Sequence, residues 1–236
     1  MKPSENKTAN HVGIILDGNR RFAKKLMLKP WKGHEWGAKK IESLLSWCKE
    51  LSIKEITLYC FSIENFNRPK LEFDHLMRIF EEEFTKIIKD PRLDENQIKV
   101  NFIGRTEMFP EKVKSAMDKL VEKTKNNNKH IINFAMAYGG RDEIVDATKK
   151  IAEKVKENKL TVEEINKELF ANNLYLKNDP DLIIRTGGDR RSSNFLCYQS
   201  AYSEWFYLEK TWPEFEKEDF LQCIEEFEQR DRRFGR

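Results

Sequence analysis

The chain has 236 residues, of which 39% are hydrophobic and 35% are charged. Lys+Arg 43 and Asp+Glu 40 leave a formal net charge of only +3, which excludes the strong basic excess typical of a dedicated nucleic-acid-binding protein. This length is enough to bury a sizeable core in one domain. The sequence contains no apolar run of the roughly 20 residues that a membrane-spanning helix needs.

The four cysteines show no C-x-x-C spacing, and the polar residues 1–10 do not resemble a secretory signal. We therefore expect a cytoplasmic protein with reduced thiols in or near the core. We expect residues 1–10 to be a polar tail and residues 11–236 to form the domain. The cysteines are Cys48, Cys60, Cys197 and Cys223.

The apolar run from His11 to Leu16 predicts a buried strand that ends in a tight turn at Asp17-Gly18-Asn19. An ordinary surface turn is the first interpretation, since Asp-Gly and Gly-Asn are common turn dipeptides. The alternative is a ligand site. Asp17 offers hard oxygen to a divalent cation, Gly18 permits close approach of a ligand to the backbone, and the two arginines that follow suit phosphate.

Strand and helix patterns alternate along the rest of the chain. This alternation predicts an α/β fold with one central, mostly parallel sheet flanked by helices on both faces. We expect a short helical or mobile segment at 22–28 and a capping box at Thr161-x-x-Glu164. Further strands are predicted at 55–61, 98–103, 130–138, 181–185, 195–199 and 204–208, and further helices at 33–51, 71–89, 110–125, 140–157, 161–170 and 217–230.

The predicted helix 71–89 presents an unusually wide apolar face. Such a face most often packs in the core, but it also suits the wall of an apolar tunnel. Its members are Leu76, Met77, Phe80, Phe84, Ile87 and Ile88.

Polar residues follow three of the predicted strands, and right-handed crossovers place these loops at one edge of the sheet. Ser62 and Asn65 suit this edge, although they are equally suited to capping the next helix. The collected guanidinium groups and the carboxylate suit two diphosphates and a magnesium ion. The loops contribute Asp17, Asn19, Arg20 and Arg21; Ser62, Asn65 and Arg68; and Arg185, Arg190, Arg191 and Ser193.

Several motifs in order resemble the cis-prenyltransferase family, that of undecaprenyl diphosphate synthase, from about His11 to Gly235. The D-G-N-R-R form of the first motif resembles the archaeal and eukaryotic branch. The motifs are H-V-G-I-I-L-D-G-N-R-R, F-S-I-E-N-F-N-R-P, Y-G-G-R, R-T-G-G-D-R-R-S-S-N-F and E-x-R-D-R-R-F-G.

The resemblance implies a prenyltransferase that uses Mg²⁺ to condense isopentenyl diphosphate with an allylic diphosphate. The product would be a long polyprenyl diphosphate with new cis double bonds, held in an apolar tunnel. The resemblance implies catalytic roles for Asp17 and Asn65 and metal binding by Asp17 and Glu204. Matches to the allylic diphosphate site are Gly18, Asn19, Arg20, Arg21, His34, Ser62 and Arg68, and matches to the isopentenyl diphosphate site are Arg185, Arg191, Ser193, Arg233 and Gly235.

The end of the chain and two local departures add to this interpretation. Arg233-Phe234-Gly235 matches a terminal R-x-G that reaches into the neighbouring active site, which implies a homodimer. Pro30 stands where bacterial members often have arginine, so Lys29 is a candidate for that contact. Asp189 and Arg190 stand where those members tend to have glutamate and histidine.

Two other functions compete with this interpretation. Some eukaryotic family members are non-catalytic partner subunits, but they lack much of the catalytic front end that this chain keeps. A nucleotide- or RNA-binding protein would carry G-x-x-x-x-G-K-[ST], G-x-G-x-x-G or a ribonucleoprotein aromatic signature, and none is present. The sequence leaves open the product length, the primer among C10, C15 and C20, and peripheral membrane association through the insoluble product.

Overall fold

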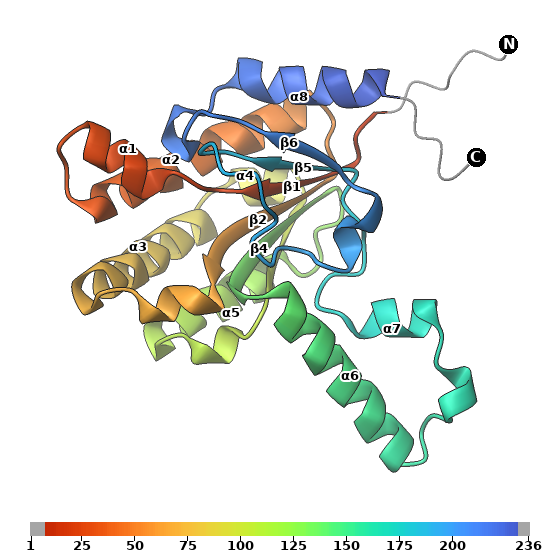
Figure 1. The fold of residues 1–236 in the computed structure, drawn as a ribbon. Helices are drawn as coiled ribbons and strands as arrows, with labels where there is room; N and C mark the ends of the chain where they lie inside the picture. The colour runs from red at the N-terminus through yellow and green to blue at the C-terminus, as the bar shows by residue number, and fades with distance from the viewer. Residues whose placement is uncertain (1–7, 231–236) are drawn as a thin grey trace, which may run out of the picture.

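The computed structural model describes residues 8–230 of the chain. These residues form a six-stranded sheet in the order β3-β4-β2-β1-β5-β6, and every pair of neighbouring strands is parallel (Figure 1). This confirms the predicted α/β fold. The strands are β1 His11–Ile15, β2 Glu55–Ser62, β3 Ile98–Ile103, β4 His130–Tyr138, β5 Leu182–Arg185 and β6 Glu204–Tyr207.

Helices cover both faces of the sheet. The α-helices are α1 Asn19–Lys25, α2 Pro30–Glu50, α3 Lys70–Ile88, α4 Arg92–Glu95, α5 Glu111–Thr124, α6 Gly140–Lys156, α7 Lys167–Asn173 and α8 Lys217–Gln229. Short 3₁₀ turns are η1 Ile63–Asn67, η2 Thr106–Met108, η3 Val162–Glu164, η4 Gln199–Tyr202 and η5 Trp212–Glu214.

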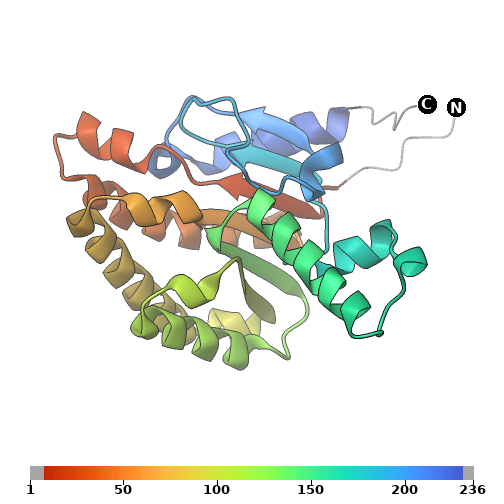
Figure 2. The ribbon, with the colours of Figure 1, turned by 60° about the horizontal axis from the view of Figure 1, so that its bottom comes forward.

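The core lies on the two faces of the sheet. On one face, apolar side chains of α2, α3, α5 and α8 form the larger cluster with the strands, as with Leu44, Phe84, Leu120 and Phe220. A smaller cluster on the other face is closed by the chain around Phe195 and by Leu176. The outer ends of α6 and α7 project away from the rest of the molecule (Figure 2). Because β1 is buried on both faces of the sheet, its sequence is a nearly continuous apolar run.

Two predicted elements are wrong. Residues 195–199 do not form a strand, because Ser193, Asn194 and Leu196 have φ values of 49°, 64° and 45°, and left-handed backbone cannot continue an extended chain. The predicted helix 161–170 is instead η3 followed by α7, which Asn166 caps by accepting from Leu169 N at 2.9 Å. The Thr161 capping box is confirmed.

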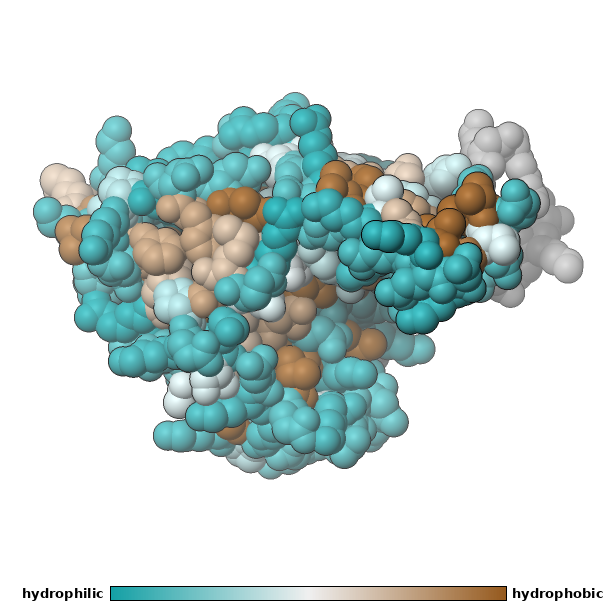
Figure 3. All heavy atoms as spheres, turned by 90° about the horizontal axis from the view of Figure 1, so that it is seen from below, coloured by the Kyte–Doolittle hydropathy of each residue, from teal (hydrophilic) through white to brown (hydrophobic). Residues whose placement is uncertain are grey.

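The predicted thiol environments are partly confirmed. Cys48 and Cys223 are buried and Cys60 is half-buried, whereas Cys197 is exposed. Among residues 8–230, no helix is long and apolar enough to cross a membrane. The face of the molecule shown in Figure 3 is mostly hydrophilic, with its apolar atoms gathered in separate groups.

Candidate active site

Asp17 follows β1 at the carboxyl edge of the sheet, and its backbone is held from two directions. Its carbonyl oxygen accepts from Thr186 Oγ1 and from the Trp212 amide, both at 2.8 Å. Gly18, with φ 100°, turns the chain so that its amide donates to Asp17 Oδ1 at 2.6 Å. A side chain at Gly18 would collide with Thr211. The carboxylate is therefore positioned by the fold before any ligand arrives.

Two arginines face this carboxylate. Nη2 of Arg185, at the end of β5, donates to Asp17 Oδ2 at 2.8 Å, and Nη2 of Arg21 lies 3.0 Å from Oδ1. Burial by itself would raise the pKa of Asp17, but the Arg185 hydrogen bond and the Arg21 charge outweigh it and lower that pKa. Asp17 is therefore ionised at neutral pH.

The loop after β5 completes this cluster. Arg21 also donates to the Gly187 carbonyl and, at 3.2 Å, to Asp189 Oδ2. Arg191 donates to Asp189 Oδ1 at 3.0 Å. Asp189, noted above as a departure, thus joins the two arginines that flank the site. A Cβ at Gly187 would lie 2.7 Å from Arg21 Nη2. Glycine at this position therefore avoids a clash with the Arg21 guanidinium group.

Arg185 is buried, with 4% of its side chain exposed, and organises the same loop. Its Nη1 donates to Ser193 Oγ at 2.6 Å and to the Arg191 carbonyl. Its Nε, although buried, makes no hydrogen bond among the residues that the structure describes. Arg185 therefore links Asp17, a predicted metal ligand, to Ser193, which the sequence analysis assigned to the isopentenyl diphosphate site.

A second cluster gathers around Glu72, near the start of α3. Oε1 of this buried carboxylate lies 3.0 Å from Arg68 Nη1, 3.6 Å from His34 Nε2 and 3.8 Å from Arg20 Nε. Arg68 Nη1 is also 3.2 Å from His34 Nε2. Sequence analysis found the three basic residues but missed Glu72. Helical spacing gave no signal for it, because Arg68 precedes α3, which begins at Lys70.

These contacts decide the charges of the cluster. The contact with His34 and the charges of Arg68 and Arg20 lower the pKa of Glu72, although burial opposes them. Burial, aided by the Arg68 charge, lowers the pKa of His34 although Glu72 opposes the shift. At neutral pH, an ionised Glu72 thus holds two guanidinium groups beside a neutral imidazole.

Asn19, the first residue of α1, is enclosed by α2. Its Nδ2 donates to the Leu16 carbonyl at 2.9 Å, while its Oδ1 is buried without a hydrogen-bond partner among the described residues. A Cβ at Gly33 would lie 1.9 Å from the Asn19 carbonyl oxygen, and one at Gly37 would lie 2.4 Å from Oδ1. Two glycines of α2 therefore allow α1 to approach closely enough to place Asn19.

Ser62 and Asn65 satisfy both interpretations that the sequence left open. They form a capping box at η1, in which Asn65 Oδ1 accepts from the Ser62 amide at 3.3 Å. Both also line the cavity described next. Their capping contacts hold them at the cavity wall.

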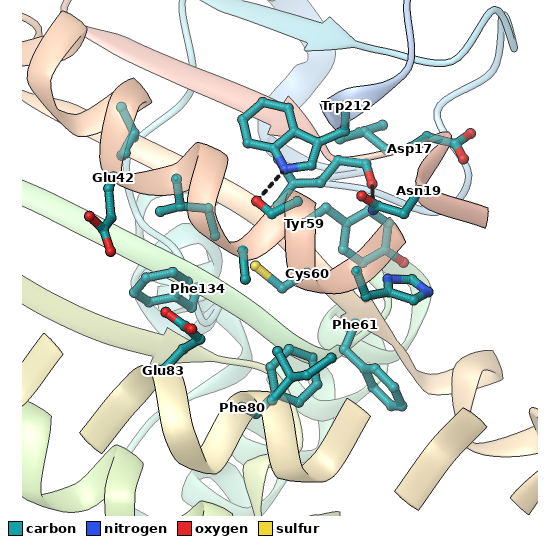
Figure 4. Close-up of a pocket in the computed structure, with 18 of the residues that line it drawn as sticks. Asp17, Asn19, Glu42, Tyr59, Cys60, Phe61, Phe80, Glu83, Phe134 and Trp212 are labelled. Atoms are coloured by element: carbon teal, nitrogen blue, oxygen red, sulfur yellow. Dashed lines mark hydrogen bonds between the residues drawn. The ribbon is translucent and has the colours of Figure 1, made fainter. Parts of the chain in front are cut away.

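One cavity of about 1960 Å³ begins at these loops and extends along the sheet between α2 and α3. Figure 4 shows Asp17 and Asn19 at one side of it and Glu42 and Glu83 at the other. Phe80, Phe84 and Phe134 are among the apolar side chains between. The wide face of α3 therefore lines a tunnel as well as packing in the core. Trp212, which the sequence analysis did not select, also lines it and donates from Nε1 to the Gly37 carbonyl at 2.8 Å.

Within one chain, the structure does not bring Glu204 to Asp17. Glu204 is the first residue of β6 and pairs with Leu182 of β5, which in turn pairs with Val12 near the start of β1. Asp17 lies beyond Ile15, at the opposite, carboxyl end of these strands. At about 3.3 Å per residue this separates the two carboxylates by more than about 10 Å. Glu204 pairs instead with Arg230 at 2.8 Å. A single chain thus does not bring the two predicted metal ligands together, and metal binding by Glu204 stays a prediction.

The remaining predicted positions have separate outcomes. Pro30, at the start of α2, lines the cavity next to Lys29. Arg190 is exposed and lies 3.7 Å from Glu209, outside the cavity lining. Arg233 and Gly235 lie outside the described residues.

The donors present suit Mg²⁺ better than a transition metal. Within residues 8–230, no group of three His, Cys, Asp or Glu residues is placed to hold a metal ion. Mg²⁺, however, binds through one or two carboxylates together with waters and substrate phosphates. The ionised Asp17 at the cavity mouth, with Asp189 across Arg21, fits that requirement.

The parallel α/β fold, with a carboxylate and several guanidinium groups at the mouth of a largely apolar cavity, suits a transferase whose substrates carry diphosphate groups. Residues 15–235 match a family model described as putative undecaprenyl diphosphate synthase. The chain therefore belongs to the cis-prenyltransferase family, as its motifs implied.

Individual relatives agree with this assignment over nearly the whole chain. A tritrans,polycis-undecaprenyl-diphosphate synthase (geranylgeranyl-diphosphate specific) from Pyrococcus horikoshii is 52% identical, with 96% of this chain and 86% of that protein covered. An isoprenyl transferase from Thermus thermophilus is 44% identical, with 96% and 88% covered. The crystal structure of lavandulyl diphosphate synthase from Lavandula x intermedia matches with a TM-score of 0.93 at 34% identity, covering 97% and 99% of the two chains.

Proposed function

We propose that this cis-prenyltransferase extends geranylgeranyl diphosphate with isopentenyl diphosphate, in a Mg²⁺-dependent reaction, to a polyprenyl diphosphate of undecaprenyl length. The cis-prenyl chain elongation is the activity of the family. The primer and the length are supported by relatives with 45–52% identity whose names specify both. The observation that carries the proposal is the ionised Asp17, held between Arg185 and Arg21 at the mouth of the tunnel.

The two clusters suit the two diphosphates of the reaction. Arg20, His34 and Arg68, gathered around Glu72, stand with Asn19 on the side from which the tunnel runs between α2 and α3. This supports assigning them to the allylic diphosphate, whose chain must enter the tunnel. Arg185, Arg191 and Ser193 in the β5 loop then hold isopentenyl diphosphate. In this arrangement Asp17 and Arg21 lie between the substrates.

Asp17 is the residue that would hold Mg²⁺, with phosphate oxygens of the substrates as further ligands. When bound, the ion supplies neutralisation of the negative charge that grows on the departing diphosphate. The guanidinium groups of Arg20 and Arg21 stabilise the same charge through fixed hydrogen-bond donors. Ser62 and Asn65, held by their capping contacts, orient the reacting end of the allylic chain.

The apolar tunnel excludes water from the reacting groups. A carbocation-like allylic centre reacts with water unless the site is closed to it, and an apolar wall also gives the growing chain a place to accumulate. Arg233 and Gly235 would complete the isopentenyl diphosphate site of a second copy, so the proposal includes a homodimer.

The proposal is tested by incubating purified protein with radiolabelled isopentenyl diphosphate, Mg²⁺ and each of three primers, namely geranyl, farnesyl and geranylgeranyl diphosphate. We expect the longest primer to be preferred and the product to have undecaprenyl length. Asp17→Ala should abolish incorporation, as should chelation of the metal. Absence of incorporation with every primer would instead favour the partner-subunit interpretation.

A further inference from the structure

The segment 20–40 is far more basic than the rest of the chain. It contains eight Lys or Arg residues and one acidic residue, Glu35, whereas the whole chain has 43 basic and 40 acidic residues. The segment comprises α1 after its first residue, the α1–α2 turn and the first half of α2. The basic residues are Arg20, Arg21, Lys24, Lys25, Lys29, Lys32, Lys39 and Lys40.

The α1–α2 turn exposes three consecutive apolar side chains among these charges. Leu26 is 46% exposed, Met27 95% and Leu28 42%. A run of exposed apolar residues in a loop is uncommon in a protein that contacts only water.

The backbone holds this exposure in place. Met27 has φ 55°, the left-handed position after a helix at which glycine is usual. The turn is also closed by hydrogen bonds from Met27 N to the Lys24 carbonyl and from Leu28 N to the Ala23 carbonyl, at 3.0 and 2.8 Å. Methionine thus stands at a position where glycine would relieve strain.

Trp36 extends the same surface along α2. It is 52% exposed, contacts Phe22 of α1 at 5.3 Å between ring centroids, and lies on the solvent face with Lys32 and Lys39 one turn to either side. Tryptophan with flanking lysines is a combination favoured at the boundary between water and lipid.

This surface borders the mouth of the tunnel. Met27, Leu28 and Lys29 line the same cavity as Asp17. The α1–α2 turn is the leftmost part of the molecule in Figure 1, and apolar atoms appear among hydrophilic ones at the left end of Figure 3. A bilayer that met this turn would therefore lie beside the entrance that prenyl chains use.

We propose that the α1–α2 surface, formed by Leu26, Met27, Leu28 and Trp36 with Lys25, Lys32 and Lys39, docks on a lipid bilayer with anionic headgroups. The apolar residues enter the headgroup boundary while the lysines contact lipid phosphates. Docking at this point lets an amphiphilic prenyl diphosphate pass between bilayer and tunnel, a consequence that rests on the proposed function.

The test is flotation of the purified full-length protein with vesicles, in the absence of any diphosphate substrate. We expect binding to vesicles of phosphatidylglycerol and phosphatidylcholine, weaker binding to phosphatidylcholine alone, and loss of binding at high salt. Met27→Asp should lower the bound fraction at least about tenfold, and Lys25→Glu with Lys32→Glu should do the same. Equal binding of these variants and the unmodified protein overturns the proposal.

A further variant separates docking from folding. Met27→Gly relieves the left-handed backbone, so it should melt at the same or a higher temperature while binding vesicles less. The matched controls are Val162→Asp, at an apolar position 63% exposed in η3, and Lys149→Glu with Lys156→Glu on α6. We expect all of these controls to bind vesicles normally.

One outcome would identify another role for the surface. If Met27→Asp changes the oligomeric mass in light scattering and leaves vesicle binding unchanged, the surface is a protein interface and the proposal fails. Because the flotation assay contains no substrate, a failure to bind vesicles would not bear on the prenyl transfer activity. Conversely, an inactive protein that floats with vesicles retains the docking surface.

Discussion

Asp17 and Arg185 are 168 residues apart in the sequence, yet Arg185 Nη2 donates to Asp17 Oδ2 at 2.8 Å. The contact exists because β1 and β5 are neighbouring parallel strands, with Ile15 opposite Arg185 at their carboxyl ends. Such a charge-assisted bond fixes both groups before a substrate binds. It also makes the carboxylate and the loop after β5 depend on one another.

Replacing Arg185 by glutamine should therefore affect more than one substrate contact. The variant loses the bonds to Asp17, Ser193 and the Arg191 carbonyl, and we expect the rate of isopentenyl transfer to fall at least about 100-fold. Arg190→Gln, in the same loop but exposed and outside the cavity lining, is the control and should change the rate less than about threefold. Similar losses in the two variants would contradict a specific role for Arg185.

Glu72 is expected to act by positioning Arg20, His34 and Arg68. Glu72→Gln keeps the shape but removes the charge that holds two guanidinium groups, so the KM for the allylic diphosphate should rise about 10-fold or more. The KM for isopentenyl diphosphate should change much less, because its cluster lies on the β5 loop. Steady-state kinetics with each substrate varied in turn distinguishes this outcome from general damage, which would affect both substrates alike.

Stability should decline on mild acidification. Burial lowers the pKa of both His34 and His11 from the ordinary value of 6.5, so the unfolded chain binds more protons than the folded one just below that pH. The contribution of these two histidines to the free energy of unfolding is fully present above pH 6.5. It is lost as the pH falls through the lower pKa that they have in the folded protein. Urea unfolding between about pH 7.5 and 5 should show this decline. The free energy of unfolding of His34→Gln should depend less on pH than that of the unmodified protein. An equal pH dependence in the two proteins would exclude His34 as a cause.

The tunnel wall should control product length. Phe80 lines the cavity and is only partly buried, so substitution there alters the space available to the chain more than the packing of the core. Phe80→Ala should shift products to greater length, and Phe80→Trp to shorter length. Phe102→Leu, at a ring that contacts Phe84 but does not line the cavity, should leave the distribution unchanged. Thin-layer separation of the dephosphorylated products measures the shift.

The close approach of α1 to α2 should be sensitive to a single methyl group. Gly33→Ala places a Cβ against the Asn19 carbonyl oxygen, which belongs to the backbone and cannot rotate away. We expect a loss of about 2 kcal/mol or more in the free energy of unfolding and a raised KM for the allylic substrate. Lys39→Ala, exposed on the same helix, should change stability by less than about 0.5 kcal/mol. Chemical denaturation of both variants gives the comparison.

Much of this protein follows from local sequence. Alternating strand and helix patterns predicted the parallel sheet, and residues 98–103 and 130–138 match β3 and β4 to the residue. The polar loops after β1, β2 and β5 were also predicted to meet, because carboxyl ends of parallel strands share one edge. These features depend on the order of residues within one element, which is why the sequence by itself determined them.

Other features depend on which side chains become neighbours in space. Glu72 looks like any acidic residue at the start of a helix until Arg20, His34 and Arg68 surround it. Likewise, Glu204 matches a motif but lies at the wrong end of β6 to join Asp17 in one chain. The tertiary structure alone decided both cases, because burial and distance across the sheet are properties of the packed chain and leave no trace in the spacing of residues.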